Sequence, residues 1–154
     1  QKIVGRLVLN LRGDVGYGDG YGDIDDLPFF KNYYAGGSST VRGFESRSLG
    51  PNTTKTGSEP LGGSIRTVGN IELYAPVPGL EDSNDKRLSL FLDSGQVFDS
   101  SKSVDISDIR ISVGGGFHWF SPIGPIALTY AIPLNDEAGD DVKTVQFTLG
   151  TFLK

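Results

Sequence analysis

The chain has 154 residues, and its 14 Lys and Arg residues against 19 Asp and Glu residues give a formal net charge of −5. This acidic balance argues against nucleic-acid binding, which needs a basic surface, and the absence of cysteine excludes disulfides and thiolate metal sites. The chain contains no run of about 18 apolar residues, so the sequence predicts no transmembrane helix. A transmembrane β-strand needs only about 9–11 residues, half of them apolar, and the chain contains six segments with that pattern.

The first of these segments covers about residues 3–17. Its apolar side chains occupy alternate positions: Ile3, Leu7, Leu9, Leu11, Val15 and Tyr17. The other positions include polar residues: Arg6, Asn10, Arg12 and Asp14. A period of two predicts a strand with two different faces, because successive side chains of a strand point to opposite sides.

A loop of about 45 residues (18–62) follows, although connections usually have about 4–6 residues. Its centre is rich in Phe, Tyr and Val, so we expect it to be ordered rather than a solvated tail. Two glycines, Gly36 and Gly37, precede a short motif made of Val41, Arg42, Gly43 and Phe44. This arrangement predicts a loop that folds back into a confined space and places one guanidinium there. The alternative is an exposed arginine flanked by turn glycines.

Five further alternating segments cover about residues 63–77, 87–98, 109–120, 123–134 and 142–153. All six segments have about 9–15 residues, which is long for soluble strands and suits strands tilted across a membrane. Their polar face carries charges at mid-strand: Arg6, Arg12, Arg66, Glu72, Asp93 and Arg110. Such charges suit a wet lumen, whereas the apolar face is almost free of charge. A soluble β-sandwich has the same alternation and is the competing fold.

Long or polar loops (18–62, 99–108 and 135–141) alternate with shorter ones (78–86 and 121–125). Membrane barrels place long loops outside and short turns in the periplasm, so we expect the first strand to run outward and the C-terminus to face the periplasm. Six strands cannot close a lumen around so long a loop, since about eight strands only just fill with side chains. The alternation is already present at Gln1, without a signal peptide. We therefore expect an all-β fold, the C-terminal six antiparallel strands of a larger transmembrane β-barrel with one lumen-folded loop.

The segment 34–44, Tyr-Ala-Gly-Gly-Ser-Ser-Thr-Val-Arg-Gly-Phe, resembles the loop motif of the BamA family, whose barrels assemble outer-membrane proteins in Gram-negative bacteria. Other segments that resemble this family are 68–76, 91–97, 119–126, 130–133 and 146–150. The resemblance implies the last six of about sixteen strands. One departure is the ending, because two residues follow Phe152, whereas outer-membrane strands typically end on an aromatic residue.

The resemblance also implies site residues. In the BamA family the loop arginine is paired with acids inside the barrel, which implies a loop anchor made of Val41, Arg42, Gly43 and Phe44. The acids at the matching positions are Glu72 and Asp93, and a planar guanidinium suits two carboxylates. The family barrel opens between its first and last strands, which implies a seam on the last strand. The seam residues are Gln146, Phe147, Gly150 and Phe152.

The function implied is that of an outer-membrane insertase, which assembles β-barrel proteins by strand pairing at the seam. The expected partners are unfolded outer-membrane proteins, outer-membrane lipid and accessory assembly lipoproteins, with no cofactor and no nucleic acid. The alternative is a related barrel of two-partner secretion or autotransporter assembly, and a passive porin fits a folded-in arginine loop less well. Two open strand edges and an apolar face predict that the isolated chain self-associates.

We expect no enzymatic activity. A single histidine, no cysteine and no Gly-x-Ser-x-Gly leave no recognisable nucleophile and base, and His118 is expected to face the lumen. The glycine-rich segment 16–23 matches neither phosphate-binding motif. The acids in and just after this segment, Asp19, Asp23, Asp25 and Asp26, could ligate calcium, although a flexible polar loop is favoured.

Overall fold

A computed structural model describes residues 7–19, 27–51, 60–80, 85–99 and 104–150 of the chain. Over these residues the chain forms one six-stranded sheet and a separate sheet of two short strands. None of the helices described there has the length and apolar character needed to cross a membrane.

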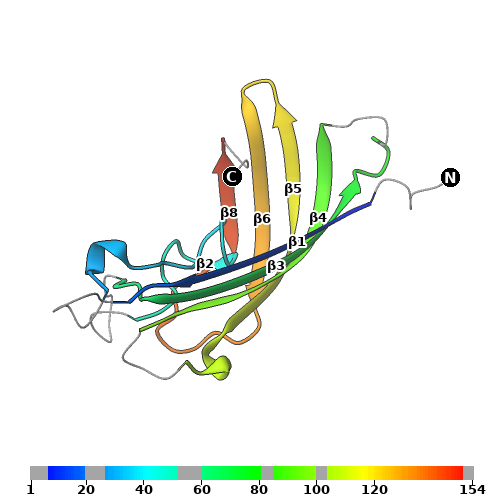
Figure 1. Ribbon diagram of the computed structural model, residues 1–154. Coiled ribbons are helices and arrows are strands. Elements are labelled where there is room, and N and C mark those ends of the chain that lie inside the picture. Colours follow the sequence, from blue (N-terminus) through cyan, green and yellow to red (C-terminus); the bar gives the residue numbers. More distant parts are fainter. Residues whose placement is uncertain (1–6, 20–26, 52–59, 81–84, 100–103, 151–154) are drawn as a thin grey trace.

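The large sheet is a meander in which every strand pairs antiparallel with its neighbours in the order β1-β3-β4-β5-β6-β8. Its strands are β1 (Val8–Tyr17), β3 (Ile65–Pro76), β4 (Lys86–Phe98), β5 (Arg110–Ser121), β6 (Gly124–Pro133) and β8 (Val145–Leu149). Each of the six alternating segments of the sequence overlaps one of these strands, so the all-β prediction with six antiparallel strands is confirmed. Figure 1 shows the sheet strongly twisted, with β1 and β3 running across the view and β6 and β8 standing nearly upright. The strands β1 and β8 form the two edges of the described sheet.

One predicted strand is wrong in its extent. The expected strand 142–153 is divided into β7 (Val142–Lys143) and β8, with Thr144 between them. The cause is a different pairing partner, because β7 pairs with the loop strand β2 (Gly43–Phe44) whereas β8 pairs with β6. Residues 151–154, and with them the predicted seam residue Phe152, lie outside the described residues.

The two faces of the large sheet differ in polarity. We call the face that carries Glu72 and Asp93 the inner face and the opposite one the outer face. On β4 the outer residues Leu88, Leu90 and Leu92 are exposed, whereas Asp93 on the inner face is buried. This pattern reverses that of a soluble domain, so the outer face suits apolar surroundings.

The inner face is covered by the long connection between β1 and β3. This connection includes the 3-10 helix η2 (Phe29–Lys31), and another, η3 (Ile106–Asp108), precedes β5. Isolated bridges pair Tyr33 with Gly63 and Ala35 with Leu49, which fold the connection back on itself. Figure 1 shows its cyan part, with β2, lying against the concave side of the sheet. The buried apolar cluster therefore lies between loop and sheet, and its members are Ala35, Val41, Phe44, Leu49, Val68 and Val97.

Candidate functional site

The loop reverses direction at two glycines before it reaches the motif. Gly36 and Gly37 have φ angles of 104° and 93°, in the left-handed region that favours glycine. A Cβ on Gly36 would lie 2.5 Å from the backbone oxygen of Glu45, so there is no space for a side chain. The Thr40 hydroxyl closes the turn, since it accepts from the Gly36 N–H at 2.9 Å and donates to the Gly36 carbonyl at 3.0 Å. This turn carries Arg42 down to the inner face.

Arg42 is joined to Asp93 of β4 by three hydrogen bonds. Its Nε and Nη2 atoms donate to the two carboxylate oxygens of Asp93 at 2.6 and 2.8 Å, and its backbone N–H donates to Oδ2 at 3.1 Å. The Asp93 side chain is fully buried. A fork-to-fork pair of this kind fixes both distance and orientation, which a lysine cannot do.

A second carboxylate and an aromatic ring complete the surroundings of Arg42. Its Nη1 atom donates to Oε1 of Glu72 on β3 at 2.8 Å, and both side chains are only 9% exposed. The guanidinium carbon lies 3.5 Å from the centre of the Phe91 ring, a cation–π contact. Asn70 donates to Oδ1 of Asp93 at 2.9 Å and to the Thr40 carbonyl at 2.6 Å, which ties the loop to the sheet a second time.

The charges of this group favour an ionised arginine. Arg42 belongs to the loop, outside the strands of the sheet. Burial works to lower its pKa, but hydrogen bonds and charge from Asp93, and then from Glu72, raise the pKa of Arg42 above its ordinary value. One cation between two carboxylates leaves the group with a net negative charge. Removing the cation would therefore leave two buried like charges facing each other.

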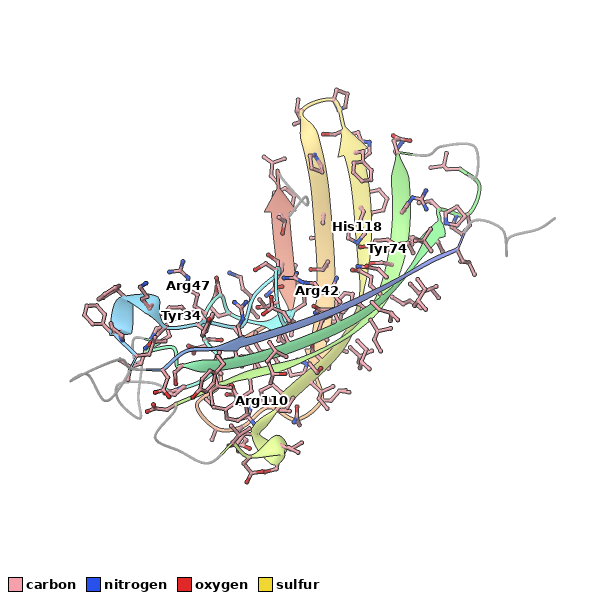
Figure 2. All side chains as sticks on the ribbon, viewed as in Figure 1. Tyr34, Arg42, Arg47, Tyr74, Arg110 and His118 are labelled. Atoms are coloured by element: carbon pink, nitrogen blue, oxygen red, sulfur yellow. The ribbon has the colours of Figure 1, made fainter. Side chains whose placement is uncertain are left out.

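His118 extends the network from Glu72. Its Nε2 atom lies 2.9 Å from the Ser89 hydroxyl and 3.5 Å from Oε1 of Glu72. Its ring packs edge-on against Tyr74, with 5.2 Å between the ring centres. Figure 2 shows Arg42, Tyr74 and His118 gathered on the concave side of the sheet, with Arg47 standing away from it. His118 thus lies on the inner face, where the sequence predicts it.

The other residues of the loop motif pack against different strands. Val41 is completely buried in the apolar cluster, beside Gly95 of β4, where a Cβ would lie 2.8 Å from the valine methyl. Gly43 has a φ angle of 94°, and a Cβ there would lie 3.3 Å from the Ala131 methyl on β6. Phe44 is also completely buried, and its carbonyl accepts from Nε2 of Gln146 on β8 at 2.7 Å.

Of the four predicted seam residues the structure describes three, Gln146, Phe147 and Gly150, and these three lie in different surroundings. Gln146 is buried on the inner face and contacts the loop motif, whereas Phe147 is 65% exposed on the outer face. Gly150 follows β8 with a φ angle of 89°, and its N–H donates to the Pro125 carbonyl at 2.9 Å. Among the three described residues of this set, Gln146 is the one that contacts the loop motif.

Three residues of the site were not singled out from the sequence: Asn70, Phe91 and Gly114. Asn70 lies on the same polar face as Glu72, and this position is the feature of the sequence that could have indicated its role in the site. Phe91 is an aromatic residue on an otherwise polar face, which could have indicated a platform for the guanidinium. Gly114 opens a run of three glycines in β5, and a Cβ there would lie 2.5 Å from the Phe91 ring. Glycine in a strand interior is a known signal of close approach.

The site offers ion pairing and packing. In the part of the chain that the structure describes, there is no group of three or more His, Cys, Asp or Glu residues that could hold a metal ion. Of the predicted calcium acids, Asp19 accepts a hydrogen bond from the Tyr17 hydroxyl at 2.9 Å, whereas Asp23, Asp25 and Asp26 lie outside the described residues. The geometry shows a structural contact: the buried cation Arg42 holds a long loop on the inner face of the sheet.

Comparison with known proteins identifies relatives along nearly the whole chain. Residues 3–153 match the model of the Omp85 superfamily domain. The chain is 37% identical over 171 positions to the outer membrane protein assembly factor BamA of Neisseria meningitidis serogroup B, an alignment that covers 94% of this chain. It is 32% identical over 148 positions to the protein of the same name from Nitratidesulfovibrio vulgaris, with 92% of this chain covered. It is also 30% identical over 132 positions to sorting and assembly machinery component 50 homolog B of Xenopus laevis, which covers 77% of this chain and 28% of that protein.

The structure is similar to that of a solved relative. The crystal structure of BamA from Haemophilus ducreyi lacking POTRA domains 1–3 superposes with a TM-score of 0.81 at 28% sequence identity, covering 92% of this chain and 31% of that one. The chain spans 22% of the length of the Neisseria relative and 17% of the Nitratidesulfovibrio relative.

Proposed function

Because the chain belongs to the Omp85 superfamily, we propose that its six-stranded sheet is part of the wall of an outer-membrane barrel that assembles other outer-membrane β-barrel proteins. The bacterial relatives carry the name of outer membrane protein assembly factor, which supports assembly over export as the task. The proposed location is the outer membrane of a Gram-negative bacterium.

The polarity of the sheet supports a place in a membrane wall. The outer face carries exposed apolar side chains on every strand of the large sheet, including Leu9, Ile71, Leu90 and Phe147. The inner face carries the ion pairs and hydrogen bonds described above. A barrel wall in lipid needs this arrangement, because its outside contacts acyl chains and its inside faces water.

The single observation that carries the proposal is the buried contact of Arg42 with Glu72 and Asp93. A loop of this length, bound by ion pairs across the inner face, supports an occupied barrel interior over an open, water-filled channel. A wall that opens and recloses beside an edge strand needs an internal brace to keep its shape, and a buried bidentate ion pair is suited to that task.

The proposed mechanism is non-covalent. An unfolded outer-membrane protein presents a strand to the free edge of β8, and backbone hydrogen bonds form between the two strands. Such pairing satisfies backbone groups that would otherwise be costly in lipid. The partners proposed are therefore unfolded outer-membrane proteins and lipid, together with accessory assembly lipoproteins, and the work needs no cofactor or catalytic residue.

A chimera tests this function directly. The aligned segment of Neisseria meningitidis BamA is replaced by this chain, and the native protein is depleted. We expect the chimera to maintain the amounts of folded porins in the outer membrane, measured by heat-modifiable gel mobility. The matched variant carries Arg42→Ala, for which we expect fewer folded porins at an equal amount of chimera.

Two outcomes separate the alternatives. A chimera that is present and folded in the outer membrane, but leaves porins unassembled in cells and in reconstituted vesicles, would contradict the proposal. Release of a substrate protein into the medium instead of its insertion would favour the export alternative.

A further inference from the structure

Four consecutive residues of the loop motif touch almost the full width of the sheet. Val41 packs beside Gly95 on β4, and Arg42 binds carboxylates on β3 and β4. A Cβ on Gly43 would lie 3.3 Å from Ala131 on β6 and 3.4 Å from Ser112 on β5. Phe44 is bound by β8 through Gln146. The motif therefore links the buried anchor on the central strands with the strand at the edge.

Gln146 is the residue that makes the contact with the edge strand. It pairs with Thr129 of β6 in the ladder, and its side chain is buried on the inner face. Its amide nitrogen donates to the Phe44 carbonyl at 2.7 Å, which fixes the orientation of the amide, because a flipped amide would set two oxygens against each other. The amide oxygen is buried with no hydrogen-bond partner among the described atoms. The bond to the Phe44 carbonyl is therefore the hydrogen bond through which this side chain acts on the loop.

A second link between loop and edge lies just before β8. Gly43 and Phe44 pair with Lys143 and Val142, and the Glu45 N–H donates to the Asp141 carbonyl at 2.7 Å. The ammonium group of Lys143 lies 2.9 Å from Oε2 of Glu45. Unlike Gln146, both side chains of this ion pair are about half exposed.

In the sheet as described, the edge strand β8 has a single ladder neighbour, so its position depends more on links of this kind. Within the described sheet β8 pairs with β6 along Val145–Leu149, whereas β4 is paired on both sides. A short strand with a single neighbour opens more readily than a central strand. The direction in which it presents its free edge then depends on what holds its inner face.

We propose that Gln146 is a positioning residue that couples the arginine anchor to β8, so that the bound loop motif fixes the direction in which this edge is presented to an incoming strand. The inference rests on the proposed function for its purpose. The coupling itself concerns only the folded chain and can be measured without a substrate.

The test measures a distance between two outer-face positions, one central and one at the edge. Leu90 on β4 and Phe147 on β8 are 68% and 65% exposed, and the chain has no cysteine of its own. Spin labels on Leu90→Cys and Phe147→Cys, in the Neisseria chimera freed of other cysteines, report the distance distribution by double electron–electron resonance. We expect a narrow distribution in the parent and one about twofold broader with Gln146→Leu, because the edge loses its inner support.

Three variants make the result specific. Thr148→Val, on the same strand and face but paired with Ala127, should leave the distribution narrow. Lys143→Glu, an exposed change that should not prevent folding, should broaden it, and Glu45→Lys combined with Lys143→Glu should narrow it again. Loop cleavage by protease should stay at the parent level in Gln146→Leu, because the contacts of Arg42 are untouched. A distribution that stays narrow with Gln146→Leu would overturn the inference, whatever the effect of Lys143→Glu.

The same experiment separates this inference from the proposed function. A chimera that assembles no porin but whose narrow distribution is lost with Gln146→Leu would retain the coupling and refute the function. A chimera that assembles porins equally well and keeps a narrow distribution with Gln146→Leu would refute the coupling and retain the function.

Discussion

Arg42 and Asp93 lie 51 positions apart in the chain and share two side-chain hydrogen bonds of 2.6 and 2.8 Å, with a third bond from the Arg42 backbone N–H at 3.1 Å. The contact is buried, and the carboxylate of Glu72 lies on the same guanidinium. Its strength therefore depends on both geometry and charge, and each can be changed separately.

Arg42→Ala should lower the melting temperature of the chimera in detergent and expose the loop to protease. The substitution leaves two buried carboxylates without a cation, a cost of up to about 3–5 kcal/mol. Arg42→Lys should restore only part of the stability, since a point charge cannot bind both oxygens of Asp93 in a fixed plane. Arg47→Ala is the matched control, because Arg47 belongs to the same loop and is exposed. Equal melting temperatures for all four proteins would refute the anchor.

Gly114→Ala should destabilise the sheet beneath the anchor, at both β6 and Phe91, without touching any charge. A Cβ on Gly114 would clash with the backbone oxygen of Tyr130 on β6 and would lie 2.5 Å from the Phe91 ring, which in turn lies 3.5 Å from the Arg42 guanidinium carbon. We expect a loss of about 1–3 kcal/mol in the free energy of unfolding, as for other overpacked sites. Gly13→Ala, at a strand position where a Cβ would meet nothing within 4 Å, should change it by less than about 0.5 kcal/mol. The idea fails if the two alanine variants are equally stable.

Glu45 should titrate below the ordinary glutamate range. The backbone N–H of Ser46, and then the side chain of Lys143, lower the pKa of Glu45. A lowered folded pKa means that this carboxylate adds stability above the ordinary pKa, and that the contribution disappears as pH falls through the lower, folded pKa. Lys143→Ala should raise the pKa only part of the way, because the Ser46 bond remains. NMR titration of labelled Glu45 measures both values, and an unshifted pKa in the parent would be inconsistent with the contact.

The isolated chain of 154 residues should self-associate in water. Its outer face exposes large apolar side chains such as Leu11 and Leu90, and β1 and β8 present free edges in the described sheet. Edge pairing through β8 is the expected route, because exposed strand edges pair with other chains. Light scattering over a concentration series, with a detergent sample as control, reports the mass. A monodisperse monomer at high concentration without detergent would exclude association.

The strands could be predicted because their two faces meet different surroundings. Alternation such as Leu88, Leu90 and Leu92 against Ser89 and Phe91 specifies both the strand and its orientation without any knowledge of its neighbours. The acids Glu72 and Asp93 were expected as partners of Arg42 for a different reason. The loop motif and the strands around it resemble the BamA family, in which the loop arginine is paired with acids at the matching positions.

The path of the loop could not be predicted in the same way. The hydrogen bond between Gln146 and Phe44 joins residues 102 positions apart, and neither segment has a periodic pattern that specifies the other. The interruption at Thr144 also follows from this distant pairing, because β2 takes β7 as its partner. The local sequence predicts local geometry such as strands. Contacts between the loop and the last strands depend instead on how the whole sheet is arranged in space.

A double-mutant cycle of Arg42→Ala and Asp93→Ala in the chimera tests the central claim most directly. The free energy of unfolding is measured for the parent, both single variants and the double variant. If Arg42 and Asp93 interact directly through hydrogen bonds between charged groups, their coupling energy should be at least about 1.5 kcal/mol. The double variant should then lose much less free energy of unfolding than the sum of the losses of the two single variants. A coupling energy near zero, with the two losses adding independently, would contradict the claim that this pair holds the loop on the inner face.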